Sequence, residues 1–389
     1  MDEIYIGREQ TAAKHLILKG YLGAFSAKLI KFYNLAYVDA FSGPWKSTSE
    51  SHEDTSFKIA LDTLLAAKKT SQDAGRKPTN VRCFFSEKKP SSHAELALFL
   101  ERYKGISQFE VRDFRGSFED AIPEIQNFIK GHFPLFFLDP TGWSGINLAK
   151  IKPLIEIVPS EVLINFMFEF INRAINMDDA KTVASFNEFL GGDDWQAELD
   201  PALPRGIAAL NLFKDRLKMA GNFKYVASTN IEMSAKDRTH FFIVYGTKDY
   251  AGLELFREQE FKTKLEHGIN RLSAKRRNAA KSKEPTFFDE LEVPSTIRTQ
   301  DEIRIRKEID TEVQQTIPEA LAKAKQLLSD SIIIEFTELS GEVLERFSLK
   351  ETHVKDICVA LANMGLIENT WSIVNKRKPD KGIILRWLP

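Results

Sequence analysis

The sequence is poor in cysteine and has no excess of charge of either sign. Its two cysteines, Cys83 and Cys358, lie far apart, which argues against a disulfide framework and against a cysteine zinc site. The formal net charge is -1 over 389 residues, so the chain as a whole is not a polycation. A nucleic-acid partner would therefore have to bind a local basic patch.

Long hydrophobic runs are also absent. No apolar run reaches the roughly 18 residues that a membrane-spanning helix needs. The first ten residues, MDEIYIGREQ, are polar and lack the apolar core of a secretory signal. Together with the low cysteine content, these absences predict a soluble protein of a reducing, cytoplasmic compartment.

Several motifs that mark common enzyme sites are missing. The sequence contains neither G-x-G-x-x-G nor G-x-x-x-x-G-K-[ST], the two loops that cradle nucleotide phosphates. Its histidines show no H-E-x-x-H spacing and no pairing with cysteine, so a metal centre has no support. The G-x-S-x-G elbow is absent too, which disfavours a hydrolase of that kind.

What the sequence does contain is a regular alternation of strand and helix patterns. Apolar runs predict strands at 35–41, 81–87, 109–114, 134–140 and 161–170, and a closing antiparallel pair at 223–233 and 240–247. A helical pattern at 11–34 comes first, with Gly20 and Gly23 expected to break or kink it. We therefore predict a doubly wound, Rossmann-like α/β sheet of seven strands, which is the strand count of class I methyltransferases.

An acid stands at or near the end of each of the first four strands: Asp39, Glu87, Asp113 and Asp139. In a parallel sheet these ends meet at one edge, where such folds bind ligands. A carboxylate after the second strand can accept both ribose hydroxyls. Asp39 would meet the charged amino-acid part of a cofactor, directly or through water, and Asp113 with Phe114 would face an adenine. The alternative for each acid is an ordinary surface cap.

The turn after the first strand has a single glycine, Gly43, followed by Pro44 and Trp45. A pyrophosphate needs close backbone approach at several glycines, and Trp45 would obstruct it. S-adenosylmethionine carries no phosphate and tolerates a bulkier turn. The turn therefore favours S-adenosylmethionine over a nicotinamide dinucleotide as the cofactor.

The segment Asp139–Pro140–Thr141–Gly142–Trp143 is similar to the [DNS]-P-P-[YFW] motif of amino-methyltransferases that act on adenine or cytosine. In that motif the acid accepts from the target amine and the aromatic stacks on an extruded base. Asp139, beside Pro140, would be the acceptor. Trp143, which stands one position later than the aromatic of the motif, would be the stacking platform. The alternative is a strand end in which Trp143 packs under a loop. Asn165, at the next strand's end, either orients substrate or is a buried structural amide.

The stretches YVDAFSGPW, FFSEKKP, FFLDPTGW and HFFIVYGTKDYAGLELF resemble the three-Cys-motif partner family, which is itself similar to class I S-adenosylmethionine-dependent methyltransferases. The resemblance extends over about Lys14–Phe256, including KHLILKGYL in the opening helix. The family's first motif ends in glycine where this chain has Trp45, and its D-P-F-G becomes D-P-T-G. The resemblance implies S-adenosylmethionine bound near Asp39, Phe41 and Gly43. It also implies a partner protein, similar to radical-S-adenosylmethionine enzymes, that carries the three cysteines.

The carboxyl-terminal part has a different composition. Residues 1–265 are predicted to form the methyltransferase-like domain, 266–318 a basic and charged linker, and 319–389 a winged-helix-like domain. The segment Arg271–Lys283 has six basic residues and no acid. It is either a solvated linker or exposed helix, or an arm that contacts nucleic-acid phosphates. The winged-helix-like domain, with its basic hairpin loop Lys376–Arg377–Lys378, either reads DNA or mediates protein contacts.

Two functions from different classes follow. The first is methyl transfer from S-adenosylmethionine to a nucleic-acid base amine in DNA or RNA modification or defence. The alternative is a non-catalytic module that uses the methyltransferase fold to dock a partner in a phage-defence or mobile-element system. Methylation of a small molecule or a protein is a third possibility.

Overall fold

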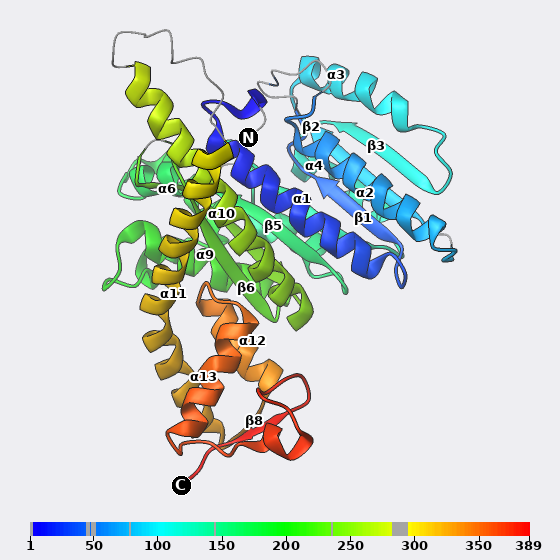
Figure 1. Ribbon diagram of the computed structural model, residues 1–389. Coiled ribbons are helices and arrows are strands. Elements are labelled where there is room, and N and C mark those ends of the chain that lie inside the picture. Colours follow the sequence, from blue (N-terminus) through cyan, green and yellow to red (C-terminus); the bar gives the residue numbers. More distant parts are fainter. Residues whose placement is uncertain are drawn as a thin grey trace. The chain divides into compact units, whose positions relative to one another are not determined.

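The computed structural model describes residues 3–43, 47, 52–77, 79–143, 145–234, 236–281 and 295–389. The chain divides into two compact units, Met1–Lys248 and Asp249–Pro389 (Figure 1). This boundary precedes the predicted one at 265/266 because one helix, α10 (Tyr250–Lys281), runs through that position without a break. The predicted linker is mostly helical where it is described, since α11 (Ser295–Ser331) follows.

Unit 1 is built on one mixed sheet of seven strands in the order β3-β2-β1-β4-β5-β7-β6. The first five strands are parallel, and β7 runs antiparallel to both β5 and β6. This order with a reversed β7 is typical of class I methyltransferases and confirms the predicted strand count and closing pair. The strands are β1 (Leu35–Asp39), β2 (Val81–Glu87), β3 (Phe109–Arg115), β4 (Phe133–Leu138), β5 (Glu161–Phe166), β6 (Tyr225–Glu232) and β7 (Thr239–Thr247).

Helices cover both faces of this sheet. Three lie on one face: α1 (Glu9–Leu29), α2 (Ser56–Asp73) and α3 (Pro90–Leu100). On the other face α4 (Phe118–Phe128), α5 (Leu148–Ile155), α7 (Ala180–Leu190) and α9 (Arg205–Gly221) pack against one another. Shorter pieces complete the unit: η1 (Glu3–Tyr5), η2 (Glu101–Tyr103), α6 (Phe168–Ala174) and α8 (Trp195–Glu198).

Side-chain alternation decides which strand residues meet which helices. Val38, Phe84 and Phe136 belong to the apolar core that also holds side chains of α4, α5, α7 and α9. Successive strand residues point to opposite faces. Asp39 therefore projects to the other face, toward α1 and α2, and the end of β4 continues on the same side with Asp139.

Gly20 and Gly23, which were expected to break or kink the first helix, do not break it. Both lie inside α1, which continues through them from Glu9 to Leu29. A glycine inside a helix costs about 1 kcal/mol relative to alanine. The buried side chains along α1, among them Ile17, Leu18 and Tyr21, offset that cost by packing on the sheet.

Unit 2 begins with α10 and α11, which pack side by side (Figure 1). A short strand and two helices follow: β8 (Ile333–Glu335), α12 (Phe336–Arg346) and α13 (Glu351–Asn363). β8 pairs antiparallel with β9 (Ile384–Arg386), and Ile367 forms an isolated bridge with Trp387. The first arm of the predicted terminal hairpin is instead a 3₁₀ helix, η3 (Thr370–Val374), because the Asn369 side chain accepts from the Ser372 backbone N–H at 3.2 Å.

Acidic neighbours within unit 2 bind several of the cations that were considered for nucleic-acid contacts. Arg276 donates to Asp301, with Nη1 2.9 Å from Oδ1, and thereby ties α10 to α11. In the loop before β9, Lys378 pairs with Asp356, and Lys376 Nζ lies 3.4 Å from Asp380 Oδ2. A phosphate would have to compete with these acids.

Candidate functional site

The candidate site lies at the carboxyl edge of the unit 1 sheet, where β1 and β4 are neighbours and the strand order reverses. Open α/β sheets bind ligands at this point because the loops that leave the two strands diverge to opposite faces. Asp39 ends β1 and Asp139 directly follows β4. The geometry of each predicted residue can be compared with the role that the sequence suggested.

Asp39 is fully buried and hydrogen-bonded within the protein. Its carboxylate accepts from Ser56 Oγ at 2.7 Å, from the Phe41 backbone N–H at 3.2 Å and from Tyr37 Oη at 3.4 Å. Burial raises the pKa of Asp39 to about 6, although the hydrogen bonds from Ser56 and Phe41 act in the opposite direction. In this arrangement the carboxylate joins the β1 turn to the start of α2, so it would reach a cofactor through its donors rather than by direct contact.

A short network fixes the turn that follows β1. The Ser42 hydroxyl donates to the Asp39 carbonyl at 2.8 Å, and the Ser42 backbone N–H donates to the Ser86 carbonyl at 2.9 Å. Phe41 is half-buried against the core, with its ring centroid 6.2 Å from that of Phe118. Gly43 is the last residue described before the gap, and Pro44 and Trp45 lie outside the described residues.

Glu87 ends β2 and is 3% exposed. One carboxylate oxygen accepts from the Lys89 backbone N–H at 2.6 Å, and burial raises the pKa of this carboxyl. Backbone hydrogen bonds from Lys89 and Lys88 act against burial and lower the pKa of the same carboxyl. An acid held by backbone N–H groups at the end of β2 stands at the position predicted for binding ribose hydroxyls.

Asp113 and Phe114 point to opposite faces of the sheet, as neighbours in a strand must. Asp113 Oδ2 lies 2.8 Å from Nε2 of His93 on α3. Phe114 stacks on Phe84 on the α4 side, with ring centroids 6.5 Å apart. One adenine ring could touch both side chains only by lying across the edge of β3. His93 was not identified from the sequence, which gives no local sign of this pairing.

Asp139 is held by two donors from distant parts of the chain. Its Oδ2 forms an ion pair with Lys14 of α1, and Asn165 Nδ2 donates to its Oδ1 at 2.6 Å. The Asp139 side chain is 19% exposed, and Pro140 behind it is buried. The sequence marked Lys14 only as the start of KHLILKGYL and gave no reason to pair it with Asp139.

Trp143 is engaged with α7. Its indole Nε1 donates to Ser185 Oγ at 2.9 Å, and its ring stacks on Phe186 with centroids 5.1 Å apart and planes 7° from parallel. The side chain is half-buried against the core. This geometry agrees with the packing alternative.

The amino-terminal part of α1 is fixed at the same edge of the sheet. Tyr5 Oη lies 2.9 Å from Nδ1 of His15, and Ser234, in the turn between β6 and β7, donates to Gln10 Oε1 at 2.5 Å. His15 is buried, and burial lowers its pKa to about 3, so its imidazole is neutral at physiological pH. These contacts set the position from which Lys14 reaches Asp139.

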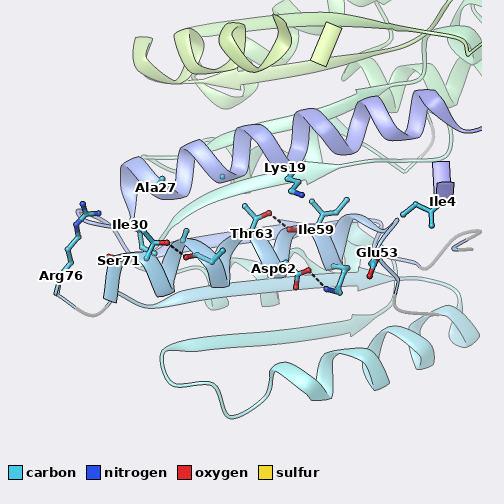
Figure 2. Close-up of a pocket in the computed structure, with 15 residues that line it drawn as sticks. Ile4, Lys19, Ala27, Ile30, Glu53, Ile59, Asp62, Thr63, Ser71 and Arg76 are labelled. Atoms are coloured by element: carbon cyan, nitrogen blue, oxygen red, sulfur yellow. Dashed lines mark hydrogen bonds and ion pairs between the residues drawn. The ribbon is translucent and has the colours of Figure 1, made fainter. Parts of the chain in front are cut away.

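A groove of about 850 Å³ runs between α1 and α2, outside the carboxyl edge of the sheet. Figure 2 shows Lys19 and Ala27 of α1 and Ile59 and Thr63 of α2 along its two sides. None of the predicted site residues lines it. The size of this groove alone would suggest a ligand site, but the polar residues predicted for the site lie at the strand ends instead.

In the part of the chain that the structure describes, no three His, Cys, Asp or Glu side chains gather closely enough to hold a metal ion. No described helix combines the length and the apolar character required to cross a membrane.

Comparisons with known proteins give only remote likenesses. No protein-family model matches the chain, and no curated protein matches it. A solved structure of loganic acid methyltransferase with SAH is 9% identical, with 72% of this chain and 92% of that chain covered and a TM-score of 0.28. An uncharacterized protein from Listeria monocytogenes serotype 4b is 11% identical, with 74% and 95% covered and a TM-score of 0.27.

At such scores neither likeness adds weight to a function. The assignment to a methyltransferase-like fold rests on the order and direction of the seven strands. Membership of the three-Cys-motif partner family stays a prediction from the sequence motifs.

Proposed function

We propose that the chain is an S-adenosylmethionine-dependent methyltransferase that acts on an amino group of a nucleic-acid base. The observation that carries this proposal is Asp139. It stands at the end of β4 beside the crevice between β1 and β4, is partly exposed, and is oriented by Lys14 and Asn165. A fixed carboxylate followed by a buried proline is the arrangement expected for an acceptor of amine protons at this strand end.

The residues present fit the cofactor at several points. Glu87 at the end of β2 would accept from the ribose hydroxyls, and Asp113 and Phe114 near the end of the next strand would face an adenine. Phe41 and Gly43 would lie along the amino-acid part, with Asp39 acting through its hydrogen-bond donors. When bound, S-adenosylmethionine supplies an electrophilic methyl group.

Asp139 would then accept a hydrogen bond from the target amine and orient the nitrogen lone pair toward the methyl group. Such positioning contributes to catalysis by replacing a random encounter with a fixed geometry. A backbone carbonyl next to Pro140 would accept the second amine proton. Trp143 would stack on the base through the indole face that Phe186 does not cover.

Unit 2 would supply nucleic-acid contacts or a partner surface. Its order of helix α11, strand β8, helices α12 and α13 and strand β9 supports a winged-helix-like interpretation. The basic segment Arg271–Lys283, of which α10 holds the part to Lys281, would contact phosphates. A radical-S-adenosylmethionine-like partner protein is a further proposal, and it rests on the family resemblance.

The first test is calorimetry with S-adenosylhomocysteine, the product form of the cofactor, on the full chain. We expect micromolar binding, and no binding at millimolar ligand would refute the enzyme proposal. The second is methyl incorporation into DNA, RNA and protein by the wild type, by Asp139→Ala and by the control Asp62→Ala. Asp62 is an exposed acid on α2. Equal incorporation by all three proteins would remove Asp139 from the mechanism.

A second candidate is the non-catalytic docking module. Two observations favour it: the Asp39 carboxylate is fully buried and accepts from three groups of the protein itself, and Trp143 is hydrogen-bonded to α7. In that case the strand ends would stabilise the fold and bind no cofactor. Calorimetry separates the two candidates, because only the enzyme binds the cofactor product.

A further inference from the structure

We infer that Lys14 is a specificity-determining residue that makes the amine-accepting position electrically neutral, so that the site takes an uncharged amino group and rejects an ammonium group. The inference rests on the proposed function, because it concerns the position at which Asp139 would receive the amine. It separates base amines, which are uncharged at neutral pH, from alkyl amines such as lysine side chains, which are protonated.

The geometry around Asp139 is specific. The Lys14 and Asp139 side chains are 13% and 19% exposed and form an ion pair. Asn165 is 4% exposed, and its Nδ2 donates to Asp139 Oδ1 at 2.6 Å and contacts Met167 Sδ at 3.2 Å. Because an ionised carboxylate only accepts hydrogen bonds, the amide must present its NH₂ group to Asp139. Each carboxylate oxygen thus has one fixed donor and retains a lone pair for a ligand.

The position of Lys14 is set by its helix. Ala13, Ile17 and Leu18 around it are buried in unit 1. The contacts of His15 with Tyr5 and of Gln10 with Ser234 fix the same end of α1 at the carboxyl edge of the sheet. Moving the Lys14 ammonium away from Asp139 would require a change of its side-chain rotamer, since these contacts hold the helix in place.

The ion pair changes what the carboxylate can bind. An unpaired carboxylate at the crevice would attract any cation, including an ammonium group. With Lys14 beside it, the pair carries no net charge, and an incoming ammonium would also be repelled by the Lys14 charge. A neutral amino group needs only a hydrogen-bond acceptor, which the pair still provides. Asp39, the other acid of the crevice, is fully buried and keeps its donors in every variant described below.

The test compares two ligands that differ in charge at the methyl position. S-adenosylhomocysteine carries a neutral sulfur there, and sinefungin carries a primary amine that is protonated at neutral pH. The measured quantity is the ratio of their dissociation constants, obtained by calorimetry on the full chain. In Lys14→Met we expect the ratio to shift in favour of sinefungin by at least about fivefold, the effect of one unit charge about 4 Å away in water, and by more where the site is shielded from solvent.

Matched variants control for structure and charge. Lys14→Arg keeps the positive charge and should keep the wild-type ratio. Lys19→Met removes a lysine from the same helix that lines the outer groove instead, and it should also leave the ratio unchanged. Asp139→Asn retains Lys14 without its partner and should shift the ratio against sinefungin. This opposite sign keeps the test decisive even if Lys14→Met fails to fold.

The outcomes separate this inference from the proposed function. If neither ligand binds the wild type, the cofactor site itself is refuted. If both bind and the ratio is the same in wild type, Lys14→Met and Asp139→Asn, the cofactor site stands and the role of Lys14 is refuted. A shift in Lys19→Met as large as that in Lys14→Met would also overturn the inference, because the effect would then be general electrostatics.

Discussion

Replacing Asp39 with asparagine is expected to stabilise unit 1 at neutral and alkaline pH. Asp39 is completely buried, and its pKa rises from 3.8 to about 6 mainly through burial. Asparagine has nearly the same shape, and its amide oxygen can still accept from the Phe41 N–H in the place of Oδ1. Its NH₂ group would take the place of Oδ2 and donate to Ser56 Oγ, whose hydroxyl can rotate to accept. The substitution therefore removes a buried charge while keeping the turn after β1 linked to Ser56.

The magnitude and its sign follow from linkage. Because the pKa is raised in the folded state, the folded protein binds more protons than the unfolded chain between about pH 4 and 6, and wild-type stability falls as pH rises through that window. The difference of about 2 pKa units corresponds to at most about 3 kcal/mol above pH 6. Asp39→Asn should gain up to this amount at pH 8 and almost nothing at pH 4.

Hydrogen exchange in peptides from β1 and β4 measures the unfolding free energy of unit 1 in the intact chain. A natural control is Asp179→Asn, because Asp179 caps α7 and its pKa is lowered by hydrogen bonds from Thr182. Its contribution is lost as pH falls, so its variant should show the opposite pH trend. If Asp39→Asn is less stable than the wild type at pH 8, or differs by a constant amount from pH 4 to 8, the account of Asp39 is wrong.

Three further substitutions test a side-chain contact in unit 1 and a backbone conformation in unit 2. Trp143→Phe should lower the unfolding free energy of unit 1 by about 1 kcal/mol, because it removes the hydrogen bond to Ser185 while keeping the stack on Phe186. Ser185→Ala should lower it by a similar amount. If the two losses add fully in the double variant, measured by urea unfolding, the contact between Trp143 and Ser185 is contradicted. Ile332→Gly should stabilise unit 2 by about 1 kcal/mol, since Ile332 is 61% exposed and has a φ of 60°, which β-branched residues adopt only with strain. Hydrogen exchange along α11 would measure the gain, and a loss of protection there would show that the isoleucine packs.

The framework of unit 1 could be predicted because its strands are local signals. Buried parallel strands read as short apolar runs, and the acids Asp39, Glu87 and Asp139 were found because they interrupt or end such runs. The opposite directions of Asp113 and Phe114 follow from the same alternation, so sequence reasoning could have separated them. The strand order, by contrast, is decided by tertiary packing that no single segment encodes.

What the sequence did not reveal are contacts between residues far apart in the chain. Lys14 and Asp139 are 125 positions apart in the sequence, and a lysine on a helix is usually a solvated surface residue. The continuity of α1 through two glycines and the helical course of α10 also depend on burial against other elements. At the carboxyl end, the capping of Ser372 by Asn369 favours η3 over the strand that the apolar pattern predicted.

Asp39 and Asp139, the two acids at the ends of β1 and β4, differ in their surroundings. Asp39 has only neutral donors around it and is cut off from solvent, so its charge is costly and its carboxylate serves the turn after β1. Asp139 has a lysine beside it and remains partly exposed, so its charge is compensated and solvent can still reach its carboxylate. Pairs of carboxyl groups in contrasting environments are how one fold separates structural from chemical roles. Asp139, with Lys14 as its counter-ion, is therefore the residue on which a test of catalysis depends.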